Sequence, residues 1–189
     1  MMYLALLGAL LGLLDFAFGE TGSARNGPLK TLALVDLQRY AGTWYEIARY
    51  PNRFQRECNS DTTAVYTLRR DGKIQVVNSC RRADGKIKTA RGTAKRADKN
   101  TNAKLKVTFF WPFYGDYWII GLGSDYRYAI VGEPKRKYLW ILSRTPEMAA
   151  QDYAEALEQV RMAGYDPRKL IATPHSSATG QMGTHSVPH

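Results

Sequence analysis

The three histidines of this 189-residue chain are His175, His185 and His189, and all three lie near its C-terminus. The body of the chain therefore lacks an imidazole for general base catalysis or for binding a metal. It also lacks the G-x-S-x-G sequence of serine hydrolases, a phosphate-binding glycine loop and a cysteine cluster. These observations argue against an enzyme, and we predict no catalytic residue, no metal ligand and no cofactor.

Glu46 is the one acidic residue that we expect to point toward the interior of the fold, from the first predicted strand. A carboxylate in such a place could serve in acid–base chemistry. The simpler interpretation is a hydrogen-bonded structural residue at the base of the fold, and we favour it.

Two cysteines are present, Cys58 and Cys80. An even number of cysteines after an export signal indicates a disulfide. Both cysteines lie at the same end of a predicted hairpin, whose strands 62–70 and 73–80 meet at the turn Asp71-Gly72. The loop before residue 62 must bend back to bring them together. We predict the bridge, and two free thiols are the alternative.

Aromatic side chains recur where the predicted strands should face the interior. An apolar cavity with a few hydroxyl and amide groups suits a lipid tail and its polar end. Periodicity cannot distinguish a hollow interior from a solid core, so both remain open at this point. Arg82 is expected at the mouth, where a guanidinium could meet a carboxylate or a phosphate. The predicted ligand-binding residues are Tyr66, Val76, Asn78, Arg82, Phe109, Tyr117, Ile119, Tyr128 and Trp140.

Short alternating segments between turn residues supply the strands that would position these side chains. They predict an all-β fold, an eight-stranded antiparallel barrel whose interior can hold one small ligand. The predicted strands are 42–50, 62–70, 73–80, 86–94, 105–109, 117–120, 128–132 and 138–142. Between them we expect a helical turn at 36–41, a mouth loop at 51–60 and an aromatic loop at 110–115.

One C-terminal α-helix is predicted after the last strand. Thr145-Pro146 suits its N-cap and first position. Apolar residues recur at helical spacing over 149–160, which predicts a helix packed on the outside of the barrel. Leu139 and Ile141 would face this helix, so Trp140 between them would face the interior.

Three segments, in this order, resemble the conserved segments of the lipocalins: Gly42-x-Trp44, Ser124-Asp125-Tyr126 and Ser143-Arg144-Thr145-Pro146. Longer stretches, 44–54, 109–117 and 138–146, resemble the bacterial outer-membrane lipocalins, which are relatives of apolipoprotein D and of the plant temperature-induced lipocalins. The resemblance implies an up-and-down barrel around one lipophilic ligand. It matches the family's pocket positions to Tyr66, Phe109, Tyr117 and Trp140.

Gly42, Trp44, Asp125, Tyr126 and Arg144 are the residues of these segments to which we assign a structural role. A buried tryptophan at the start of a strand needs a partner for its ring face. We predict that the guanidinium of Arg144 stacks on the Trp44 ring.

The chain divides into a signal peptide (1–20), a linker (21–35), a lipocalin domain (36–172) and a disordered tail (173–189). Residues 2–14 are almost wholly apolar but are shorter than the roughly 20 residues of a membrane span. We therefore expect export to the periplasm or to the periplasmic face of an outer membrane. Residues 1–20 contain no cysteine, so no lipid anchor is expected.

The formal net charge is +10, and removal of residues 1–20, with Asp15 and Glu20, would raise it to about +12. Residues 81–106 contain ten Lys or Arg and two Asp. These cations are either solvated outward faces or a surface that meets anionic lipid head groups. Nucleic acid is disfavoured because the cations do not alternate with exposed aromatics. A homodimer is left open.

The sequence thus indicates a lipid-binding lipocalin that stores or transports fatty acids or lysophospholipids at the cell envelope, for membrane maintenance. One alternative is a carrier of a tetrapyrrole, a retinoid or a steroid. Another is an isomerase on the same barrel. Known lipocalin enzymes use a pocket thiol or an acidic site, and neither Cys58 nor Cys80 is expected at a strand-interior position.

Overall fold

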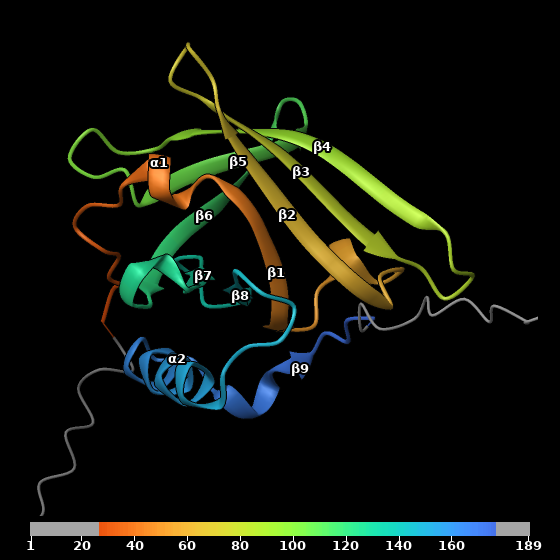
Figure 1. Ribbon diagram of the computed structural model, residues 1–189. Helices are drawn as coiled ribbons and strands as arrows, with labels where there is room; N and C mark the ends of the chain where they lie inside the picture. Colours follow the sequence, from red (N-terminus) through yellow and green to blue (C-terminus); the bar gives the residue numbers. More distant parts are fainter. Residues whose placement is uncertain (1–26, 177–189) are drawn as a thin grey trace, which may run out of the picture.

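Alternating side chains build eight antiparallel strands into a closed barrel in the computed structural model, which describes residues 27–176 (Figure 1). Strand β1 closes the ring because it pairs with both β2 and β8, and a short extra strand, β9 (Ile171–Ala172), pairs with the end of β1. The barrel strands are β1 (Gly42–Arg49), β2 (Ser60–Leu68), β3 (Ile74–Arg81), β4 (Ile87–Arg96), β5 (Lys104–Phe110), β6 (Phe113–Leu122), β7 (Tyr128–Gly132) and β8 (Leu139–Ser143). The predicted eight-stranded barrel is confirmed.

Short helical segments lie between and after these strands. Helix α1 (Leu37–Tyr40) precedes β1, and its N-cap residue Asp36 accepts hydrogen bonds from two backbone amides. Helix α2 (Ala150–Met162) lies on the outside of the barrel, beside β7 and β8 (Figure 1). The single turns of 3₁₀ helix are η2 (Arg53–Gln55), η3 (Ser124–Tyr126) and η4 (Pro167–Lys169).

Two apolar cores result from the alternation of the strands. The inner core fills part of the barrel and includes Trp44, Leu105 and Leu142. The outer core lies between the barrel wall and α2, where Leu139 and Ile141 of β8 pack with Val160 of the helix. Trp140 lies between Leu139 and Ile141 in the sequence and faces the inner core, as predicted.

The start of α2 differs from its prediction. The helix begins at Ala150 with Ala149 at the N-cap, and no side chain caps it. Thr145 is not the N-cap, because its hydroxyl donates instead to the carbonyl of Glu147, at 2.6 Å. This local bond lies within a bend at residues 144–147 that leads from β8 toward the helix.

The predicted aromatic loop 110–115 is mostly strand. Strand β5 extends to Phe110, β6 begins at Phe113, and these two residues pair across the hairpin. Only Trp111 and Pro112 remain in the turn. Proline is tolerated there because the turn needs no ladder hydrogen bond from its nitrogen.

Residues 27–35 and 173–176 belong to the fold, although we predicted a linker and a disordered tail there. The Leu32 amide donates to the Ile119 carbonyl at 3.2 Å, and Val35 is buried. At the other end, the Thr173 amide donates to the Ile47 carbonyl at 2.9 Å. The predicted signal peptide (1–20) and the remainder of the linker and tail lie outside the described residues. Within residues 27–176, we find no helix with the length and apolar character needed to cross a membrane.

Candidate ligand-binding site

A cavity of about 650 Å³ occupies the barrel interior. This volume lies within the range of roughly 300–1,000 Å³ that small-ligand pockets have. The cavity is lined by inward-facing side chains of the strands and, at its entrance, by the mouth loop between β1 and β2. Its walls are largely apolar and include Ile74, Leu105 and Val107.

Six of the nine predicted ligand-binding residues line this cavity. They come from strands β2, β3, β5, β6 and β8, which the barrel brings together around one space. Phe109 has room because residue 92 of the neighbouring strand is glycine, and a Cβ there would come within 2.8 Å of the phenyl ring. The six residues are Tyr66, Val76, Asn78, Phe109, Tyr117 and Trp140.

Two of the nine are buried elsewhere. Ile119 points inward but lies in the packed part of the inner core, and it does not border the cavity. Tyr128 faces α2, and its hydroxyl accepts a hydrogen bond from Gln159 at 2.8 Å. The prediction that Tyr128 contacts the ligand is therefore wrong. All five residues of β7 are buried, so its sequence does not alternate and does not indicate which side faces inward.

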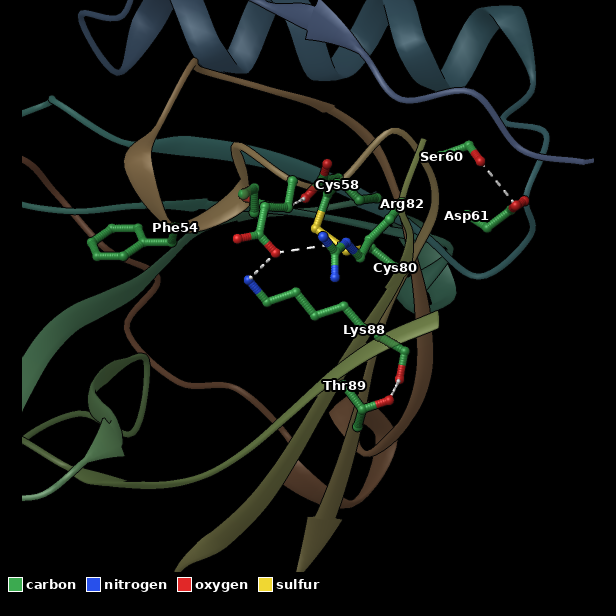
Figure 2. The surroundings of a disulfide bond; sticks show 12 residues. Phe54, Cys58, Ser60, Asp61, Cys80, Arg82, Lys88 and Thr89 are labelled. Carbon is green, nitrogen blue, oxygen red and sulfur yellow. Dashed lines mark hydrogen bonds and ion pairs between the residues drawn. A yellow bond between two sulfur atoms is a disulfide. The ribbon is translucent and has the colours of Figure 1, made fainter. Parts of the chain in front are cut away.

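Arg82, the ninth predicted residue, lies outside the cavity. It borders a separate shallow surface pocket, where its Nε is 3.8 Å from the Glu57 carboxylate and 4.0 Å from that of Asp84. Lys88 borders the cavity entrance instead, with its Nζ 3.1 Å from Glu57 (Figure 2). Lys88 of β4 and Arg53 of the mouth loop are thus cations that border the cavity, and Arg82 is not.

The mouth loop is attached to the barrel by the predicted disulfide. Cys58 of the loop is bonded to Cys80 of β3, with their Cα atoms 5.5 Å apart, and Phe54 lies on the same loop (Figure 2). The Asn59 amide donates to the Arg81 carbonyl at 2.8 Å, so the chain bends back as the pairing requires. The disulfide prediction is confirmed.

Gln55 of the mouth loop reaches into the cavity. Its side-chain amide donates to Glu46 at 2.5 Å and its carbonyl oxygen accepts from the Trp140 indole at 2.9 Å. Asn52 donates to the same oxygen at 2.8 Å. These bonds fix the loop over one side of the cavity.

Glu46 is buried beneath the mouth loop, so our placement of it at the base of the barrel is wrong. Besides Gln55, its carboxylate accepts from the Thr173 hydroxyl at 2.6 Å and lies 3.1 Å from the Nε of Arg49. Burial raises the pKa of this carboxyl, and the hydrogen bonds and Arg49 only partly offset it. In residues 27–176, we find no group of three or more His, Cys, Asp or Glu placed to hold a metal ion.

Three tyrosine hydroxyls meet at the opposite end of the cavity. The Tyr117 hydroxyl lies 2.7 Å from that of Tyr40 and 2.9 Å from that of Tyr66. Burial raises the pKa of all three, that of Tyr66 to about 12, so they are protonated at neutral pH. We call this group the tyrosine floor.

Beneath the floor, Arg144 stacks on Trp44 as predicted, and its guanidinium also donates to the Ala41 and Thr43 carbonyls. Asp125 and Tyr126 lie at the same closed end. Asp125 pairs with Arg39 at 3.3 Å, and the same guanidinium lies 4.4 Å from the centre of the Tyr126 ring.

Sequence reasoning missed Gln55 and Tyr40 as cavity residues. Gln55 lies in a loop, where no periodicity indicates which way a side chain points. Tyr40 lies in the short helix α1, and its hydroxyl contact with Tyr117 joins it to a strand 77 residues away.

A family model described as a lipocalin-like domain matches residues 35–175. The chain is 42% identical to temperature-induced lipocalin-1 of Arabidopsis thaliana, over 79% of this chain and 84% of that protein. It is 45% identical to the outer membrane lipoprotein Blc of Escherichia coli K12 (72% and 77% covered) and 34% identical to apolipoprotein D of Macaca fascicularis (91% and 94%). Insecticyanin of the tobacco hornworm Manduca sexta is similar in fold, with a TM-score of 0.63 at 24% identity, over 79% of this chain and 86% of that one.

Proposed function

Because this chain belongs to the lipocalin family, we propose that it binds a fatty acid or a lysophospholipid in the barrel cavity. In this proposal the protein is exported and stores or transports these lipids at the cell envelope, for the maintenance of membranes. The observation that carries the proposal is the apolar cavity of about 650 Å³, with a lysine at its entrance. Lipocalins are mostly binding proteins rather than enzymes, which agrees with this role.

The mechanism is burial of the acyl chain. As the chain enters the cavity it leaves water, and each buried methylene contributes roughly 0.8 kcal/mol. Part of this gain is offset by the ordering of a flexible ligand. Ile74, Val76 and Leu105 supply apolar wall for this contact.

The charge at the entrance supports a ligand that enters tail first. Lys88 and Arg53 both border the cavity there. The Lys88 ammonium is paired with Glu57, and the two side chains are 42% and 53% exposed. An anionic carboxylate or phosphate head group at the entrance can replace Glu57 as the partner of Lys88 without being removed from water.

Exposed aromatic side chains around the entrance support contact with a membrane. At the β5–β6 turn, Phe110, Trp111 and Phe113 are 75%, 78% and 72% exposed, and Phe54 of the mouth loop is also exposed. We call these four residues the aromatic rim. Exposed apolar clusters of this kind mark interaction sites, and aromatic rings favour the lipid–water interface.

The rim lies at the same end of the barrel as a basic turn, because the β3–β4 turn carries Arg82 and Lys86 and the start of β4 carries Lys88. Each cation near an anionic bilayer contributes about 1 kcal/mol of attraction. We propose that the rim docks on a bilayer that contains anionic phospholipid, so that a lipid passes between bilayer and cavity with little exposure to water. The similarity to an outer membrane lipoprotein and the apolar residues 2–14 support a site at the envelope.

Mass spectrometry of the lipids extracted from the purified full-length protein tests the proposed ligand class. Fatty acids or lysophospholipids in stoichiometric amount are the expected result. A tetrapyrrole, a retinoid or a steroid recovered instead would contradict the proposal and support the alternative carrier. Absence of any lipid, together with no binding of a fluorescent fatty acid to the delipidated protein, would overturn lipid binding itself.

A further inference from the structure

The tyrosine floor has more O–H donors than hydrogen-bond contacts. Tyr40, Tyr66 and Tyr117 contribute three hydroxyl protons, and the floor contains two hydroxyl–hydroxyl contacts, of 2.7 and 2.9 Å. Each contact uses one proton, whichever oxygen donates. Whichever hydroxyl donates in each contact, one of the three O–H groups is left without an acceptor within residues 27–176.

This free donor lies at the largely apolar inner end of the cavity. Tyr40 and Tyr66 are 2% and 7% exposed, and all three rings line the cavity. Leu105 and Ile74, which also border the cavity, offer no acceptor. A buried donor without a partner costs about 1–3 kcal/mol. The fold therefore retains an unfavourable group at the end of the cavity that a ligand reaches last.

Loss of the proton cannot relieve this cost at neutral pH, because burial raises the pKa of all three hydroxyls. The nearby cation is already occupied, since Arg144 stacks on Trp44 and donates to backbone carbonyls. A carboxylate at the floor would exchange its full hydration for a single neutral donor, which is unfavourable. The floor thus suits a neutral acceptor.

Asn78 is a second polar group inside the cavity without a partner. It lies on β3, two residues from Val76, which pairs with Tyr66, so it faces the interior one layer above the floor. Its side-chain oxygen is buried and has no hydrogen-bond partner in the described part of the chain. An unmodified acyl chain satisfies neither this amide nor the floor.

We propose that the tyrosine floor binds a neutral oxygen, of a hydroxyl, ketone or ester group, at the far end of an otherwise apolar ligand. The ligand class is then a lipid that is oxygenated away from its head group. This inference rests on the proposed function, from which it takes the tail-first orientation of the ligand. It deepens that function by specifying the far end of the ligand, because a saturated acyl chain would place a methyl group against the free donor.

The test compares matched ligands on the full chain. Saturated fatty acids and ω-hydroxy fatty acids of the same lengths are titrated into delipidated protein and followed by calorimetry, over a series of chain lengths. At the length that reaches the floor, the ω-hydroxy acid is expected to bind about threefold to tenfold more tightly, as one net hydrogen bond provides. Equal or weaker binding of the hydroxy acid at every length would overturn the proposal, because a water molecule would then serve the donor.

Variants give a signature that follows from counting protons. In Tyr40→Phe or Tyr66→Phe, two hydroxyls and one contact remain, so one donor stays free. These variants should therefore still bind the ω-hydroxy acid more tightly than the saturated acid. In the triple variant Y40F/Y66F/Y117F no hydroxyl remains, and the preference is lost while the saturated acid binds at least as well. Tyr128→Phe, which removes a hydroxyl on the helix side, is the matched control. Preference that persists in the triple variant would also overturn the proposal.

The outcomes separate this inference from the proposed function. If neither acid binds to the unaltered protein, the proposed lipid ligand is wrong. If both acids bind equally, the lipid ligand stands and the role of the floor is refuted.

Discussion

The guanidinium carbon of Arg144 lies 3.7 Å from the centre of the Trp44 ring, which is completely buried. The same guanidinium donates to the carbonyls of Ala41 and Thr43 at 3.1 and 3.0 Å. Gly42 between them has a φ of 98°, a conformation that favours glycine, and a Cβ there would lie 3.4 Å from the guanidinium. One side chain from the end of β8 thus closes the barrel over the start of β1.

Arg144→Ala is expected to destabilise the protein without a direct effect on the ligand. It removes a partly desolvated cation–π contact and two charged hydrogen bonds, which together contribute about 2 kcal/mol or more. Denaturant unfolding measures the change, and Arg144→Lys should recover only part of it because lysine lacks the planar fork. Loss of lipid affinity at unchanged stability would contradict a structural role.

Reduction of the Cys58–Cys80 bond is expected to loosen the mouth loop. The bond closes a loop across a sequence separation of 22, which corresponds to about 3 kcal/mol of loop-closure entropy. Cys58→Ser/Cys80→Ser should lower the unfolding midpoint and speed ligand release in stopped-flow displacement. Thiol reagents should label nothing in the native protein. An unchanged release rate would show that the loop does not control the entrance.

Trp140→Ala is expected to weaken fatty-acid binding by roughly 1–3 kcal/mol, because it removes a large apolar wall and the partner of Gln55. Trp118 is the matched control, since it packs in the outer core and not in the cavity. Titration with a fluorescent fatty acid compares the two variants at temperatures where both are folded. A stronger effect from Trp118→Ala would reverse our assignment of the interior.

Glu46 makes stability depend on pH in a defined direction. Its pKa in the folded protein is raised above the ordinary value of 4.5 by burial. As pH rises through 4.5 toward the raised value, the unfolded chain releases its proton first, so the free energy of unfolding falls. Glu46→Gln should remove this decline in urea unfolding measured over a pH series. An unchanged slope in the variant would assign the decline to other groups.

Asp61 acts in the opposite direction and provides the control. Burial opposes its ionisation, but hydrogen bonds from Ser176 and Arg81 outweigh burial and lower its pKa. Its contribution is therefore present above the ordinary value of 3.8 and is lost as pH falls. Asp61→Asn should abolish this loss on the acid side and leave the decline caused by Glu46 in place.

The aromatic rim is expected to carry binding to anionic vesicles. Phe110→Ser/Trp111→Ser should weaken co-sedimentation with phosphatidylglycerol vesicles by tenfold or more, since two exposed rings no longer enter the interface, each at about 1 kcal/mol or more. Leu34→Ser is the control, because Leu34 is 76% exposed and lies before α1, at the closed end. Equal loss in both variants, or no loss in the rim variant, would refute docking by the rim.

The sequence by itself determined the barrel, the outer helix and six of the residues that line the cavity. Apolar and polar residues alternate clearly in β2, β3, β5 and β8. In each of these strands the period of two predicts which residues face the interior, and these include Tyr66, Val76, Phe109 and Trp140. The pairing of Trp44 with Arg144 was likewise available, because the segments that carry them are recognisable without coordinates.

Only the tertiary structure decided features that depend on contacts between distant segments. Tyr128 belongs to a strand buried on both sides, so alternation gave no information about its direction. Arg82 and Lys88 are both cations near one hairpin end, and only the closed geometry shows which one borders the cavity. The tyrosine floor joins α1, β2 and β6, and its free donor results from the distances between three hydroxyls. Periodicity fixes the face on which a side chain lies, whereas its hydrogen-bond partners depend on how that face is brought against the others.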